Sequence, residues 1–249
     1  MQALLMKTYL LFIFLICLGF SSNSQDKSGY NYFVQDIKTP DNSTQIEINK
    51  KGDTVLVAYY KINNLISRSN QEFTKVYKGT PFFRNGWYKG VMRTDNGASL
   101  NFTMAYNIQK DEVYLVNDPT QDAKSIKPIE FAMEGHTFKQ FKDRYYEYIY
   151  EGKSLILKEY QCLLQLNSSA QKTGYEPEGA ESEYEGEFLK SAKYYLKNEN
   201  KLKEIPLNKR VFKLFGEHSK TVEAYAKSNE LRPNKEGSLL AIFKYFDSL

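Results

Sequence analysis

The stretch SLNFTMAYNIQ, from Ser99 to Gln109, alternates apolar and polar or small side chains without a break. One parity carries the large apolar residues, and the other carries Asn, Thr, Ala and Gln. A period of two is typical of a β-strand, in which successive side chains point to opposite faces of a sheet. We therefore expect a half-buried strand, with one face against a core and the other against water or small neighbours.

Similar segments follow one another from Lys78 to Gln165, separated by turn residues such as Asn85-Gly86. Short connections of this kind join antiparallel neighbours. The pattern predicts a mainly β fold, an antiparallel meander that forms an open or a closed barrel-like sheet. A short C-terminal helical appendage is expected after it.

The N-terminus has the pattern of a signal peptide. A positive charge at Lys7 precedes an apolar run of about 12 residues that ends at Phe20, and small residues follow it. Such a run is shorter than the roughly 20 residues that span a bilayer. We expect residues 1–24 to be cleaved off, which leaves no transmembrane segment. The mature protein is then exported, and is periplasmic or outer-membrane-associated.

The mature chain is predicted to have three regions: a flexible leader at 25–44, an antiparallel β domain at 45–205 and short helices at 206–249. Within the β domain, Lys61 to Val76 is rich in Asn and Ser and is predicted as a loop with room for one short helix. The segment from Ser125 to Met133 is predicted as one strand with Ile129, Phe131 and Met133 on one face. The apolar segment from Ser154 to Gln165 is expected at the centre of the sheet.

From Pro206 onward, the apolar residues follow helical spacing. Asn208 and Asn234 stand where helix N-caps are expected, and Gly216 is expected to end the first helix. Helices this short are marginal alone, so we expect them to pack on the sheet or on one another. The last helix carries an apolar stripe of Leu239, Ile242, Phe243 and Phe246.

Charge and cysteine content exclude some classes of function. The net charge of +4 is too small to indicate nucleic-acid binding. After cleavage one cysteine remains, Cys162, which is predicted to be a buried small hydrophobic residue. An acidic block from Glu176 to Glu187 precedes a C-terminal part, beginning at Phe188, that holds 13 Lys and Arg against 7 Asp and Glu. We interpret these as a solvated loop and a solvated helical face, with a docking surface as the alternative.

Catalytic candidates are few. No motif for a phosphate, dinucleotide, zinc or calcium site is present, so we predict no cofactor and no metal. His136 and His218 are interpreted as surface or capping residues. Glu147 and Glu151 share one parity of a Tyr-rich segment and therefore one predicted face. Paired carboxylates hydrolyse glycans, although acids on a solvent-facing strand explain the pattern equally well.

The apolar parity of the opening stretch provides a second candidate site. In a barrel or half-barrel, Phe102, Met104 and Tyr106 would line a cavity for one small apolar ligand. In a filled core, the same residues would only pack. The sequence leaves both interpretations open.

Four segments carry a resemblance: YKGTPFF at 77–83, WYKG at 87–90, AYN at 105–107 followed by DE at 111–112, and FKYFDSL at 243–249. With the signal-peptide pattern, they resemble exported proteins that are common in Bacteroidota and have no established activity. The resemblance implies an envelope location and transfers no catalytic residue. We therefore expect a non-catalytic envelope protein that binds a protein partner or a small apolar ligand, with a glycan-directed hydrolase as the alternative.

Overall fold

The computed structural model describes residues 42–64, 69–94, 96–116, 123–167 and 183–249. These residues belong to one unit, Asn31–Leu249. The predicted signal peptide, most of the predicted leader and the first part of the acidic block lie outside the described residues.

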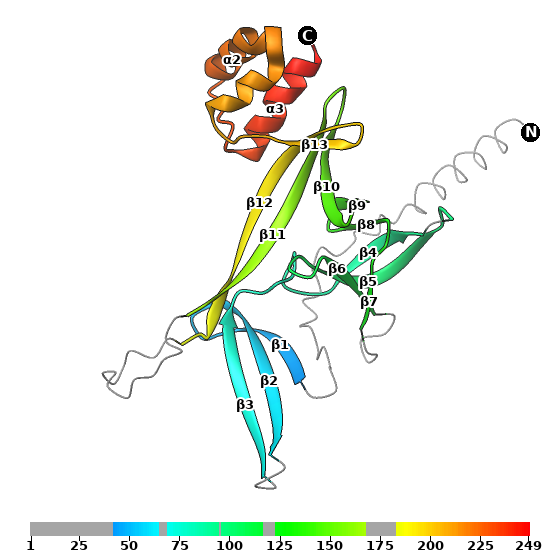
Figure 1. Cartoon of the computed structure of the whole chain (residues 1–249), viewed down its shortest axis with the longest axis vertical. Helices are drawn as coiled ribbons and strands as arrows, with labels where there is room; N and C mark the ends of the chain where they lie inside the picture. The colour runs from blue at the N-terminus through cyan, green and yellow to red at the C-terminus, as the bar shows by residue number, and fades with distance from the viewer. Residues whose placement is uncertain (1–41, 65–68, 95, 117–122, 168–182) are drawn as a thin grey trace, which may run out of the picture. The chain divides into compact units, whose positions relative to one another are not determined.

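The fold is mainly β, as predicted, and its strands form one open, mostly antiparallel sheet (Figure 1). The strand order is β1-β2-β3-β12-β11-β10-β9-β8-β4-β5-β6-β7, with β13 paired to β12, so the first and last strands of the order do not meet. Of the two predicted alternatives, the open sheet is confirmed. The strands are β1 (Asn42–Ile48), β2 (Thr54–Asn64), β3 (Ser69–Lys78), β4 (Tyr88–Arg93), β5 (Ser99–Asn107), β6 (Glu112–Val116), β7 (Lys124–Ile126), β8 (Glu130–Met133), β9 (His136–Phe141), β10 (Arg144–Glu151), β11 (Leu155–Leu166), β12 (Gly186–Asn198) and β13 (Lys201–Glu204).

Strands β11 and β12 form the longest ladder of the sheet, with paired residues from Ile156↔Leu196 to Leu166↔Gly186. β10 pairs with the other side of β11, so the prediction that this apolar segment is central is confirmed. The first two residues of β12 also pair with the end of β3, in the one parallel pairing among the described strands. β12 therefore joins the N-terminal hairpins to the rest of the sheet.

The predicted loop from Lys61 to Val76 is wrong. The end of β2 and most of β3 occupy this segment, in a continuous antiparallel register that runs from Val55↔Lys78 to Asn64↔Ser69. Asn and Ser have low strand propensity. The ladder nevertheless satisfies the backbone N–H and C=O groups of both strands, and this outweighs a weak local preference.

The single strand predicted from Ser125 to Met133 is also wrong. β7 and β8 are separate strands, and the residues between them include Pro128, which has no N–H to donate to a ladder. Phe131 and Met133 are buried on β8 as expected, whereas Ile129 is half exposed because it lies in the connection.

Strand β5 contributes to two cores, which corrects the expectation of one buried face. Its outer end is exposed, but from Met104 to Asn107 both faces are buried. Ala105 packs in a hairpin core with residues from β1, β2, the β3–β4 connection, β6 and β12: Ile46, Leu56, Phe82, Trp87, Tyr114, Val116 and Phe188. The other face packs in an aromatic core of Met104, Tyr106, Ile108, Val113, Phe131, Met133, Phe138 and Tyr145.

Three helices follow the sheet: η1 (Lys209–His218, a 3-10 helix), α2 (Ser219–Ser228) and α3 (Glu236–Asp247). Asn208 caps η1 as predicted, accepting a hydrogen bond from the Arg210 backbone N–H at 2.9 Å. The chain kinks at Gly216, where φ is 54°. The predicted cap at Asn234 is wrong, since Lys235 occupies the N-cap of α3 without a side-chain hydrogen bond.

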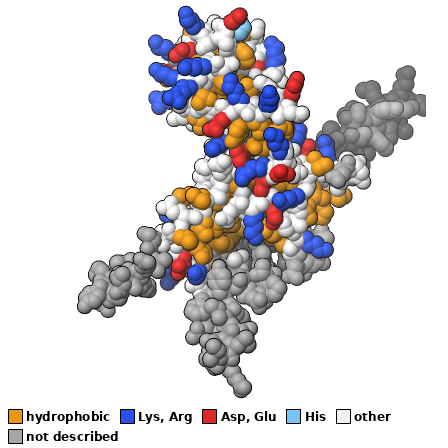
Figure 2. Space-filling view, viewed as in Figure 1, with side chains coloured by type: hydrophobic (Ala, Val, Ile, Leu, Met, Phe, Trp, Pro, Cys, Tyr) orange, Lys and Arg blue, Asp and Glu red, His pale blue; other side chains and the backbone are white. Residues whose placement is uncertain are grey.

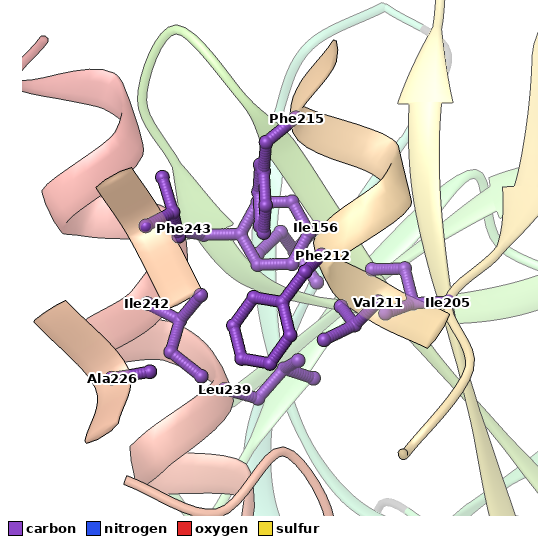
Figure 3. Packing of buried hydrophobic residues seen from close by; sticks show 10 residues of the cluster. Ile156, Ile205, Val211, Phe212, Phe215, Ala226, Leu239, Ile242 and Phe243 are labelled. Carbon is purple, nitrogen blue, oxygen red and sulfur yellow. The ribbon is translucent and has the colours of Figure 1, made fainter. Parts of the chain in front are cut away.

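The helices share a third core with the sheet (Figure 3). Ile156 of β11 and Ile205, just after β13, lie among the buried residues of all three helices. The expectation that the helices pack on the sheet and on one another is confirmed. The helical contributors are Val211, Phe212, Phe215, Val222, Ala226, Leu239, Ile242 and Phe243.

Candidate functional site

The two acidic candidates lie on β10, but they do not share a face. The register between β10 and β11 shifts between Tyr148 and Tyr150, so one residue of β10 has no partner opposite it. Such a bulge reverses the parity of all later side chains. Glu147 is consequently buried, whereas Glu151 points to the opposite face and is exposed, with its carboxylate 3.9 Å from the Lys139 ammonium. The prediction that Glu147 and Glu151 share one face is therefore wrong.

Both oxygens of the Glu147 carboxylate are occupied. One accepts a hydrogen bond from Nδ1 of His136 at 2.5 Å, and the other accepts one from the Tyr160 hydroxyl at 2.7 Å. The side chain is 9% exposed, so these bonds replace most of its hydration. Burial and then the bond to Glu147 raise the pKa of Tyr160, which keeps its proton on the phenol.

His136 connects this carboxylate to a cation. Its Nε2 lies 3.2 Å from a guanidinium nitrogen of Arg84, and its ring meets the edge of Phe83 at 5.0 Å between centroids. A guanidinium only donates hydrogen bonds, so Nε2 acts as the acceptor and Nδ1 carries the proton towards Glu147. The resulting order is Arg84, His136, Glu147 and Tyr160.

A second group lies beside this network on the same face of the sheet. Lys158, which is opposite Glu147 in the β10–β11 register, has its ammonium 2.6 Å from Glu236 and 4.7 Å from the Tyr160 ring centroid. The Tyr194 hydroxyl donates to the same oxygen of Glu236 at 2.8 Å. Because Glu236 is the first residue of α3, this group fastens the helices to β11 and β12.

The pKa of Glu236 reflects opposing effects. Partial burial on its own raises the pKa, but the hydrogen bonds from Lys158 and Tyr194 outweigh it, and the net effect is a lowered pKa. Burial and the bond to this carboxylate raise the pKa of Tyr194. The carboxylate is therefore the charged partner of a fixed ammonium.

The polar atoms of this arrangement bond to one another. Both Glu147 oxygens and His136 Nε2 are already bonded within the protein, and every buried side-chain N or O atom in the described part of the chain has a partner. The contacts of these two groups hold the strands and the helix α3 together.

The predicted ligand-lining residues lie in the aromatic core. Met104 and Tyr106 are 0% and 1% exposed, and Phe102 is half-buried against the same cluster. Tyr106 contacts the rings of Phe131 and Phe138 at 5.3 and 5.2 Å. At Met104 and Tyr106, side chains rather than a cavity therefore occupy the predicted ligand face.

The remaining candidates lie in positions that are typical of structural or surface residues. Cys162 is half-buried between the hairpin core and the aromatic core, and burial raises its thiol pKa. His218 is exposed and lies against the Phe246 ring at 6.0 Å. Within the described residues, no group of three or more His, Cys, Asp or Glu side chains could hold a metal ion.

The helices carry an excess of positive charge that we call the basic helical surface. Its eight cations are all exposed, and none forms an ion pair with a described residue. Figure 2 shows Lys and Arg side chains gathered over the helices. Two of the five acidic residues of this region, Glu236 and Asp247, bond to sheet residues instead. The eight cations are Lys209, Arg210, Lys213, Lys220, Lys227, Arg232, Lys235 and Lys244.

Sequence reasoning anticipated this charge excess but missed the network. Arg84, Lys158 and Glu236 gave no local signal, because they meet only through pairings between distant segments. The only sign of these residues in the sequence is that they are charged residues within mostly apolar or aromatic segments.

No family model, curated protein or solved structure matches the chain. No helix among the described residues is both long and apolar enough to cross a membrane.

Proposed function

We propose that the protein is an exported envelope protein that binds an acidic protein partner through its basic helical surface, without catalysing a reaction. The observation that carries this proposal is the set of eight exposed cations without ion pairs to described residues. Clustered charge of one sign attracts a partner of the opposite sign and accelerates its association. The signal-peptide pattern supports export.

The positions of four of these cations favour a role in binding over a role in helix stability, whereas Lys227 and Lys244 lie in the last turns of their helices, where positive charge is favourable. Lys209 and Arg210 lie in the first turn of η1, Lys220 lies in the first turn of α2, and Lys235 is the N-cap of α3. The helix dipole makes positive charge unfavourable at these ends. These residues therefore destabilise their own helices. Binding of an acidic partner would explain why positive charge is present at these positions.

The two alternative functions have less support. A glycan-directed hydrolase needs two cooperating carboxyl groups, but Glu147 and Glu151 lie on opposite faces of β10. A small apolar ligand enclosed by the sheet would have to displace Met104 and Tyr106, which are already packed.

Site-specific photo-cross-linking in the native host tests the proposal. A photoreactive residue is placed at Lys213, Lys220 or Lys227 in turn, and a matched control is placed at the exposed Lys89 of β4. We expect one discrete cross-linked species from the helical positions, which disappears when the other two lysines are changed to glutamate. Equal cross-linking from Lys89, or a helical product that survives charge reversal, would contradict the proposal.

A further inference from the structure

A depression of about 420 Å³ lies at the outer end of the aromatic core, on β4 and the connection between β7 and β8. This volume lies within the range of small-molecule sites, roughly 300 to 1,000 Å³. Its lining combines apolar, polar and basic side chains: Met92, Arg93, Thr94, Asn96, Ile126, Lys127 and Pro128.

The floor of the depression is continuous with the aromatic core. Met92 and Ile126 pack against that core from its edge. Leu100, which is opposite Met92 in the β4–β5 register, is 43% exposed, and Ile129, next to Pro128, is 50% exposed. Apolar side chains are therefore exposed at neighbours of two lining residues, Met92 and Pro128.

The rim of the depression is positively charged. Lys127 is exposed and forms no ion pair with a described residue. Arg93 lies 3.7 Å from Glu130. Lys139 lies 4.0 Å from Glu130 and 3.9 Å from Glu151, so two carboxylates balance these two cations. Lys127 is the rim cation without a carboxylate partner among the described residues, and its charge favours an anionic group beside it, within reach of the Arg93 guanidinium.

We propose that this depression binds a single-chain amphiphile with an anionic head, such as a free medium-chain carboxylate. The alkyl chain lies on Met92, Ile126 and Pro128, and the head group accepts hydrogen bonds from Lys127 and Arg93. The site goes beyond the proposed function, because it lies on β4 and the β7–β8 connection and takes a small molecule. It also differs from the predicted enclosed cavity, since the ligand rests on the outer end of the core and displaces neither Met104 nor Tyr106.

Methionine-methyl NMR provides a local measurement. In the described chain, Met92 lines the depression, while Met104 and Met133 are buried in the aromatic core at 0% and 2% exposure. Protein labelled with [¹³C-methyl]methionine is titrated with octanoate below its micelle concentration. We expect a saturable shift of the Met92 methyl signal alone, and weaker binding of octan-1-ol, which has the same chain without the charge.

Charge variants test the head-group contact. Lys127→Glu is expected to weaken octanoate binding by about tenfold, which corresponds to the loss of one charge-assisted contact. Lys124→Glu makes the same charge change at an exposed neighbour outside the lining and is expected to leave the affinity within about twofold.

Four results of the octanoate experiments would overturn the proposal, and a fifth comes from vesicles. The four are an unchanged Met92 signal, equal affinity for octan-1-ol, equal weakening by both charge variants, and Met104 and Met133 shifts that show entry into the core. An arm with phosphatidylglycerol vesicles separates the two sources of an anionic amphiphile. A Met92 response to vesicles but not to free octanoate would assign the depression to a membrane surface and refute a site for free ligand.

Discussion

Replacing Glu147 with glutamine tests whether the polar network stabilises the fold. The carboxylate accepts hydrogen bonds from His136 and Tyr160 at 2.5 and 2.7 Å. Glutamine has nearly the same shape, but only one of its two terminal atoms accepts hydrogen bonds. Its NH₂ group then faces one of the two donors, and that bond is lost.

The expected loss follows from the geometry. A hydrogen bond to a charged group contributes about 1.5 to 3 kcal/mol. The His136 side chain is 26% exposed, so its donor can bond to water after the change, which places the cost in the lower part of that range. We expect Glu147→Gln to lower the free energy of unfolding by about 2 kcal/mol, or the melting temperature by about 4 to 8 °C for a chain of this size.

Urea unfolding followed by circular dichroism measures this loss, with Glu151→Gln as the matched control. Glu151 is exposed and 3.9 Å from Lys139, so its replacement should change stability by less than about 0.5 kcal/mol. A double-mutant cycle with Tyr160→Phe shows which of the two bonds glutamine loses. An unchanged cost of Tyr160→Phe in the Glu147→Gln background places the loss at His136, and a reduced cost places it at Tyr160. The reasoning is refuted if Glu147→Gln matches the control.

Three further predictions concern the core, the helix attachment and the sheet. Phe243→Ala removes a 1% exposed ring from the helical core and should cost about 3 to 5 kcal/mol in urea unfolding. The lowered pKa of Glu236 means that its carboxylate stabilises the fold above pH 4.5, the unfolded value, and that this contribution is lost as pH falls through the folded pKa. The stability difference between wild type and Glu236→Gln should therefore shrink as pH falls below 4.5. Gly90→Ala should cost about 1 to 3 kcal/mol, because the new Cβ would lie 2.5 Å from the backbone carbonyl oxygen of Ala132 and 2.6 Å from Met104 Sδ. Gly237→Ala, with nothing within 4 Å, should instead stabilise α3 by about 0.5 to 1 kcal/mol.

Each of these predictions has a contradicting outcome. A Phe243→Ala loss below about 1 kcal/mol would mean that the helical core repacks around the gap. A difference for Glu236→Gln that stays constant down to pH 3 would show that the carboxylate is not the stabilising group. Equal effects of Gly90→Ala and Gly237→Ala on stability would show that the expected steric clash at Gly90 of β4 does not occur.

Local patterns predicted most elements of the fold. Alternation identified β4, β5, β6 and the region from β9 to β11, and Asn208 was correctly predicted as a cap. The errors occur where local preference and tertiary pairing disagree. The Asn- and Ser-rich segment forms the β2–β3 ladder because a neighbouring strand supplies hydrogen bonds to its backbone.

The candidate site was far less predictable than the fold. Parity placed Glu147 and Glu151 on one face, and a one-residue bulge separated them. Nothing local signals that bulge. Glu236 reaches Lys158 across 78 residues of sequence, so no pattern within either segment could reveal the contact.

The sequence by itself determined the mainly β class, the helical C-terminus and the excess of positive charge, because periodicity and composition are local properties. Only the tertiary structure decided the strand order, the filling of the aromatic core, the Glu147 network and the depression beside Met92. The physical reason is that register and strand order depend on the summed packing and hydrogen bonding of distant segments. That sum includes bulges and single contacts whose energies are small in isolation and decide the arrangement only together.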